Sequence, residues 1–240
     1  MIRKPNFKLN WKYALGEVLL IFIGISLAVA FQNWNEQRVA RQKEQHFLNE
    51  LKSNLEQDIE QLDQLYRLLK ARKERAQSVL DILGDIPKEI DTAALITNVE
   101  RSGWFFTFRP NLSTYNEIIS TGSLDLIRSD TLKERLSFYK TRTENGLEID
   151  RYNARNIKDF ESMIPLYVEE GLGAIDMVSP NPTLYKNLSI DLKGMSRDKV
   201  LISKLRSVVN HSNSEIAYKQ DLIEPLINEL IEIVVNELNQ

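Results

Sequence analysis

The chain begins with a long apolar stretch. Residues 13–31 are apolar or small, apart from Glu17 and Ser26. As an α-helix this stretch would be roughly 28 Å long, close to the ~30 Å hydrocarbon core of a bilayer. Aromatic residues, which favour the membrane interface, flank it at both ends: Trp11, Tyr13, Phe31 and Trp34. The pattern predicts a transmembrane helix over residues 13–32, with the lipid bilayer as its partner.

Two other interpretations of this stretch compete with a membrane anchor. Its basic flank, apolar centre and small residues Ala28-Val29-Ala30 also fit a signal peptide, and a core helix of a soluble protein is the third possibility. The chain continues after Ala30 without a helix-breaking residue, which favours the uncleaved anchor. Whether cleavage occurs after Ala30 stays open.

Four basic residues and no acid precede the stretch: Arg3, Lys4, Lys8 and Lys12. Because cytoplasmic flanks carry such an excess, we expect a cytoplasmic tail over residues 1–12 and a periplasmic body at an inner membrane. The whole chain has a formal net charge of −3, and the part after the span is more acidic still. Nucleic-acid binding needs a concentrated basic face, so this balance argues against nucleic acid as a partner.

One face of the predicted span is small and polar. Steps of three and four residues along the helix connect Glu17 with Gly24 and Ala28. The spacing Gly24-x-x-x-Ala28 lets two transmembrane helices approach closely, whereas Glu17 is costly inside the membrane. Either Glu17 reaches up to the interface, or this face contacts another transmembrane helix. The second interpretation predicts a homo-oligomer or a membrane-protein partner.

Beyond the span, apolar residues recur every three and four positions. The first series runs from Leu48 to Leu83 and is wide enough to be buried by two neighbouring helices. It predicts a long helix over residues 33–83, which can be continuous with the span. Gly84 and Pro87 then mark its end.

Two further series complete the helical pattern. The second covers residues 130–164 and is polar in its middle third, where we expect it to be weakly specified or to face water. The third covers residues 197–239 and contains Pro225, which should kink or restart the helix. The predicted fold is mainly α: one N-terminal transmembrane helix that continues into an elongated helical bundle or coiled-coil domain over residues 33–240.

The segment over residues 101–128 is unusually rich in aromatic residues. Its candidate cluster consists of Trp104, Phe106, Phe108, Arg109 and Tyr115. The cluster is interpreted as a small cap that closes the far end of the bundle. The alternative is an apolar pocket in which Arg109 binds an anionic ligand.

Recognisable catalytic chemistry is missing from the sequence. There is no cysteine, and the chain has neither a glycine-rich phosphate loop, a G-x-S-x-G motif nor an H-E-x-x-H motif. His211 has Glu215 one turn later, but no third metal ligand is in view. Asp58 and Arg72 fall on core positions and are interpreted as exposed gaps or interhelical partners. We therefore predict no enzyme, no cofactor and no metal.

Three segments resemble a known family: "YALGE" at residues 13–17, "NWNEQR" at residues 33–38, and "STYNEIISTGSLDLIRSDTLKERLSFY" at residues 113–139. They are similar to a domain-of-unknown-function family of bacterial single-pass membrane proteins. The most specific part is the juxtamembrane motif, which consists of Asn33, Trp34, Asn35 and Glu36. The resemblance implies an uncleaved anchor and supplies no activity.

The sequence thus predicts a membrane-anchored helical protein that acts through protein–protein interaction or as a scaffold at the inner membrane. The alternative is an extracytoplasmic ligand-sensing domain. Because residues 1–12 are too few for an output domain, its signal would pass through a partner membrane protein. An enzyme ranks behind both.

Overall fold

The computed structural model describes residues 11–168 and 189–239. Within these ranges the chain is helical, and one isolated bridge between Val168 and Ile190 is the only β pairing. The mainly α fold is therefore confirmed. The longer elements are α1 (Trp11–Gly84), α2 (Thr92–Ser102), α3 (Ser113–Ser120), α4 (Asp130–Glu161), α6 (Lys199–Tyr218) and α7 (Glu224–Leu238). The predicted tail over residues 1–12 lies almost entirely outside the described residues.

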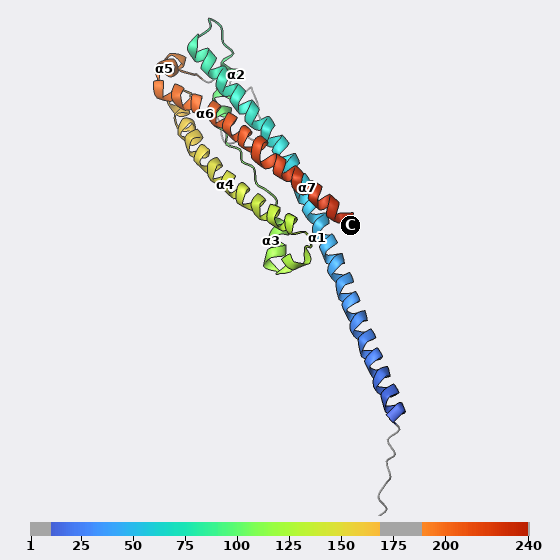
Figure 1. Cartoon of the computed structure of the whole chain (residues 1–240). Coiled ribbons are helices and arrows are strands. Elements are labelled where there is room, and N and C mark those ends of the chain that lie inside the picture. The colour runs from blue at the N-terminus through green and yellow to red at the C-terminus, as the bar shows by residue number, and fades with distance from the viewer. Residues whose placement is uncertain (1–10, 169–188, 240) are drawn as a thin grey trace, which may run out of the picture.

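Helix α1 is continuous over 74 residues, which corresponds to about 110 Å. No proline interrupts it, and its glycines before the last turn are Gly16 and Gly24. Its N-terminal half extends alone, whereas α2, α4, α6 and α7 lie beside its C-terminal half (Figure 1). Every described side chain from Leu15 to Val39 is exposed. Among the described helices, this one alone is long and apolar enough to span a membrane.

The C-terminal half of α1 forms the centre of the bundle. Its predicted core positions are all buried: Leu48, Leu51, Leu55, Asp58, Leu62, Leu65, Leu69, Arg72, Ala76, Val79 and Leu83. Two hydrophobic clusters result. The proximal cluster, nearer the exposed half of α1, ends on α1 at Leu69, and the distal cluster begins at Ala76. A polar layer around Arg72 separates them.

Helix α4 starts where the sequence predicts, because the Ser129 side chain accepts a hydrogen bond from the Leu132 backbone N–H. Its middle third does not face water, in contrast to the expectation from its polarity. Thr143, Gly146, Asp150 and Asn153 are all buried. Asp150 joins the same polar layer as Arg72 and accepts hydrogen bonds from Lys219 and the Thr107 hydroxyl, whereas Thr143 donates to backbone carbonyls of α4 itself.

The third helical series is divided in two by a π-helical turn at Lys219–Ile223. Pro225, near the start of α7, has no backbone N–H to donate, and the wider turn accommodates this loss. The buried residues of α6 are Leu201, Leu205, Val208, Ser212 and Glu215. Leu205 and Ser212 are positions of the apolar series that the sequence predicts, whereas Leu201, Val208 and Glu215 each lie one position before its members Ile202, Val209 and Ile216.

The aromatic segment does not close the far end of the bundle, which corrects the predicted cap. After α2, the chain returns along α1 toward the proximal end, where α3 lies (Figure 1). The side chain of Asn54 on α1 donates a hydrogen bond of 2.7 Å to the Thr114 hydroxyl on α3. Asn54 belongs to the proximal part of α1, so the segment covers a side of the bundle and not its distal end.

Candidate functional site

The small and polar face of α1 is uncovered. Glu17, Gly24 and Ala28 are all exposed, and helical spacing places them in one line. A Cβ atom added at Gly24 would meet nothing within 4 Å. The described part of the chain therefore leaves this face available to a second helix.

The juxtamembrane motif continues the same helix. Around it, Gln32 donates to Glu36 at 2.9 Å and Arg38 donates to Asn35 at 3.4 Å. The Arg38 guanidinium lies 5.6 Å from the centre of the Trp34 ring, within cation–π range. Asn33 and its three neighbours in the motif are exposed. These contacts are formed within α1 itself, so the motif stays accessible to other molecules.

Just beyond this motif, the buried carboxylate of Glu44 connects α1 to the rest of the bundle. Glu44 is 1% exposed and accepts hydrogen bonds from the Arg41 side chain and the Arg128 backbone N–H, both at 2.7 Å. Arg41 also donates to the backbone carbonyl of Glu237 at 2.9 Å. We name Arg41, Glu44, Arg128 and Glu237 the collar. It joins α1, the start of α4 and the end of α7.

Sequence reasoning missed the collar. Glu44 lies four residues before Leu48, so the buried stripe extends one turn further than its apolar members show. The only sequence signal is this helical spacing. Its partners at Arg128 and Glu237 come from distant parts of the chain.

The predicted aromatic cluster is divided between several environments. Phe108 is buried, and Phe106 and Tyr115 pack against the proximal cluster. Trp104 lies beside Arg101, with 5.1 Å between the guanidinium and the ring centre. Arg109 is exposed and does not line the nearby hollow, which is formed by Phe105, Phe106 and α1 side chains. The geometry of this hollow therefore does not support Arg109 as a ligand for an anion bound there.

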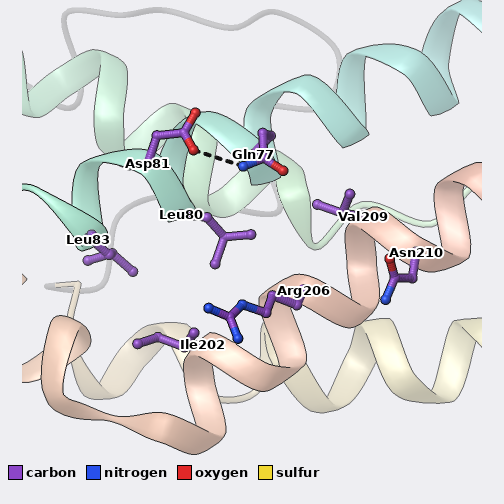
Figure 2. A pocket seen from close by; sticks show the side chains of 9 residues that line it. Gln77, Leu80, Asp81, Leu83, Ile202, Arg206, Val209 and Asn210 are labelled. Atoms are coloured by element: carbon purple, nitrogen blue, oxygen red, sulfur yellow. Dashed lines mark hydrogen bonds between the residues drawn. The ribbon is translucent and has the colours of Figure 1, made fainter.

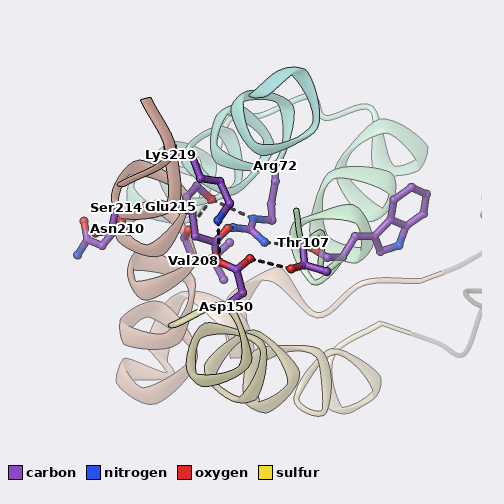
Figure 3. Close-up of polar contacts among 10 residues, drawn as sticks. Arg72, Thr107, Asp150, Val208, Asn210, Ser214, Glu215 and Lys219 are labelled. Carbon is purple, nitrogen blue, oxygen red and sulfur yellow. Dashed lines mark hydrogen bonds and ion pairs between the residues drawn. The ribbon is translucent and has the colours of Figure 1, made fainter. Parts of the chain in front are cut away.

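The polar layer contains two buried ion pairs, shown in Figure 3. Arg72 is completely buried and donates to the Glu215 carboxylate at 2.8 Å, to the Ser212 hydroxyl at 3.0 Å and to the Trp104 carbonyl at 3.3 Å. Lys219 donates to Asp150 at 2.7 Å. We name Arg72, Asp150, Glu215 and Lys219 the ion network. Its two positive and two negative charges balance.

Burial dominates the electrostatics of Glu215. Desolvation raises the pKa of this carboxyl, and the positive charges of Arg72 and Lys219 oppose the rise. One oxygen, Oε1, has no hydrogen-bond partner within the described part of the chain. The carboxylate therefore depends on Arg72, its hydrogen-bond donor among the described residues, at 2.8 Å. The sequence showed Glu215 only as a residue one turn after His211 and did not indicate its contact with Arg72.

Asp58 shows that a polar residue on a core position can join helices. Its carboxylate accepts from the Tyr139 hydroxyl on α4 at 2.7 Å and from the Asn111 backbone N–H at 2.8 Å. Burial raises the pKa of Asp58 despite these two bonds. The interpretation as an interhelical partner is therefore confirmed for Asp58, as it is for Arg72.

The raised pKa of Asp58 predicts a pH dependence of stability. A carboxyl that binds its proton more tightly when folded makes the free energy of unfolding fall as pH rises from the unfolded pKa through the folded one. We expect the Asp58→Asn variant to lose this fall above about pH 4, as measured by urea unfolding of the full chain in detergent. The exposed control Asp63→Asn should keep the original slope. If the free energy of unfolding had the same pH dependence in both variants, this dependence could not be assigned to Asp58.

The amino-acid sequence itself places the chain among known proteins. Residues 17–147 match a family described as a family of unknown function, DUF6090. This range covers more than half of the 240 residues. The chain belongs to this family. No curated protein and no solved structure matches it.

The DUF6090 match contains most of the features on α1. It includes Glu17, the juxtamembrane motif and Glu44, and it ends within α4 before Asp150. Glu215 and Lys219 of the ion network therefore lie beyond it. The description of DUF6090 assigns no activity, so the function has to be argued from the geometry.

Proposed function

We propose that the protein is anchored by the N-terminal half of α1 in an inner membrane, with a cytoplasmic N-terminus and a periplasmic bundle, and acts as a scaffold that binds another membrane protein. The observation that carries this proposal is the contrast within α1. Side chains from Leu15 to Val39 are exposed, whereas the core positions from Leu48 onward are buried in the bundle. A bilayer is the environment that suits the exposed apolar half.

The contact with this membrane protein is assigned to the face of α1 that carries Glu17, Gly24 and Ala28. An intramembrane carboxylate is disfavoured against lipid and usually faces other protein. The small residues Gly24 and Ala28 permit close approach of a second helix over the same face. The partner is therefore a transmembrane helix, either of a second copy or of a different protein.

The collar supports a scaffold role. Because Arg41 and Glu44 join α1 to the ends of α4 and α7, the bundle is held in a fixed orientation relative to the span. A partner that binds in the membrane would thus position the bundle above it. No catalysis is assigned to the chain in this proposal.

Disulfide cross-linking tests the contact, and the chain suits it because it has no cysteine. We expect Gly24→Cys and Ala28→Cys to form cross-linked species when native membranes are oxidised. Ser26→Cys is the matched control, since it lies between them in depth and on the opposite side of the helix. A product of twice the chain mass indicates a second copy, and another mass indicates a different partner. Equal cross-linking through Ser26→Cys would contradict the assigned face.

The second candidate function is ligand sensing through a partner membrane protein. The observation in its favour is a hollow between α1 and α6 at the distal end of the bundle (Figure 2). Stabilisation of the full chain by a small molecule would favour sensing, whereas co-purification with a membrane protein in the absence of ligand would favour the scaffold.

A further inference from the structure

We propose that the distal end of the bundle binds a small zwitterion of the α-amino-acid class with an apolar side chain. The site, which we name the distal hollow, has a volume of about 360 Å³, within the usual range for small-molecule sites. It is lined by Gln77, Leu80, Asp81, Leu83, Ile202, Arg206, Val209 and Asn210. This inference does not rest on the membrane contact proposed above.

Four of the side chains that line the distal hollow are aliphatic. Leu83 is buried, and Leu80, Ile202 and Val209 are half-buried, so these side chains still present hydrocarbon surface to the hollow (Figure 2). Covering them with an apolar group removes that surface from water, which is favourable. This part of the hollow therefore suits an aliphatic or aromatic side chain.

Two opposite charges line the same hollow without pairing. The Arg206 guanidinium points inward between Leu80 and Ile202, while Asp81 lies on the α1 side (Figure 2). Within the described part of the chain, neither residue makes a salt bridge, with the other or elsewhere. One Asp81 oxygen accepts from Gln77 at 2.8 Å, and a carboxylate can accept further bonds at its other oxygen.

A zwitterion matches this arrangement better than a simple ion. A ligand carboxylate can bind Arg206 with two parallel hydrogen bonds, and a ligand ammonium can bind Asp81. An anion without an ammonium would meet the Asp81 carboxylate, and a cation without a carboxylate would meet Arg206. The amides of Gln77 and Asn210 on the rim add neutral hydrogen-bonding groups. An α-amino acid carries both charges beside one apolar side chain.

Equilibrium dialysis of the full chain in detergent tests the proposal. The probes are radiolabelled L-leucine, L-isoleucine, L-valine, L-methionine and L-phenylalanine, and at least one should bind saturably. Arg206→Gln and Asp81→Asn should each weaken that binding by about tenfold or more, since each removes a charged hydrogen-bond partner. The exposed pair Arg67→Gln and Asp63→Asn on α1 is the matched control and should leave binding unchanged.

Competition with single-charge analogues completes the test. Hexanoate carries only the carboxylate and isoamylamine only the ammonium, so each should compete at least about tenfold less well than the bound amino acid. Absence of saturable binding by all five probes at millimolar concentration overturns the proposal. Unchanged binding in Arg206→Gln, or equal competition by hexanoate, overturns it as well. None of these results affects the cross-linking test of the membrane contact.

Discussion

Replacement of Arg72 by methionine should lower the free energy of unfolding by about 3–5 kcal/mol, because it leaves a buried carboxylate without its cation. Glu215 is 1% exposed, and Arg72 is the donor that reaches it at 2.8 Å. The Ser212 hydroxyl and the Trp104 carbonyl also lose a donor. Urea unfolding of the full chain in detergent, followed by helical circular dichroism, measures the loss.

Removal of both partners provides the control. The double variant Arg72→Met with Glu215→Leu should recover most of the lost stability, since an apolar replacement of a buried ion pair is often close to neutral. The single variant should also lose less at acidic pH, where the Glu215 carboxyl, with its raised pKa, becomes protonated. Arg67→Met, at an exposed position of α1, should cost less than about 0.5 kcal/mol. A similarly small cost for Arg72→Met would contradict the ion network.

Proline at Val39 should bend α1 between its exposed N-terminal half and the bundle. Val39 lies in the exposed part of the helix, where proline removes one backbone hydrogen bond and clashes with the preceding turn, at a cost of about 3 kcal/mol or more. Spin labels on Ala30→Cys and Asn49→Cys lie on either side of this point, 19 residues apart in sequence. In the continuous helix their backbone separation is roughly 28 Å.

Pulsed electron paramagnetic resonance distinguishes the two states. The chain with native Val39 should give one narrow distance distribution, because α1 is continuous, whereas Val39→Pro should give a shorter and broader one. Val39→Ala is the matched control and should keep the narrow distribution. If Val39→Pro also keeps the narrow distribution, the continuity of α1 at Val39 does not fix the orientation of the bundle relative to the N-terminal half of α1.

Helical periodicity was sufficient to predict the core of α1 and α4. Leu48, Leu83, Leu132 and Phe160 are buried as their spacing indicates, since apolar residues at intervals of three and four lie on one helix face. Periodicity was less informative for α6, where Leu201 and Ile202 are both apolar and either could face inward. The π-helical turn at Lys219–Ile223 has no apolar signature.

The polar layer shows what a single sequence leaves undetermined. The position of Arg72 on the core stripe of α1 was visible in the sequence, but its partners were not. Glu215 lies 143 residues after Arg72, and only the folded arrangement of α1 and α6 brings them together. The aromatic segment had a similar ambiguity, because its composition does not specify which side of the bundle it covers.

The distance in sequence between α1 and its covering helices has a consequence for synthesis. Glu215 emerges 143 residues after Arg72, which at about 5–20 residues per second takes roughly 7–30 s. During that interval the long apolar stripe of α1 has no α6 or α7 to cover it. A nascent chain of this kind exposes an apolar surface for many seconds, so its yield in cells should depend on holdase chaperones more than its final stability suggests.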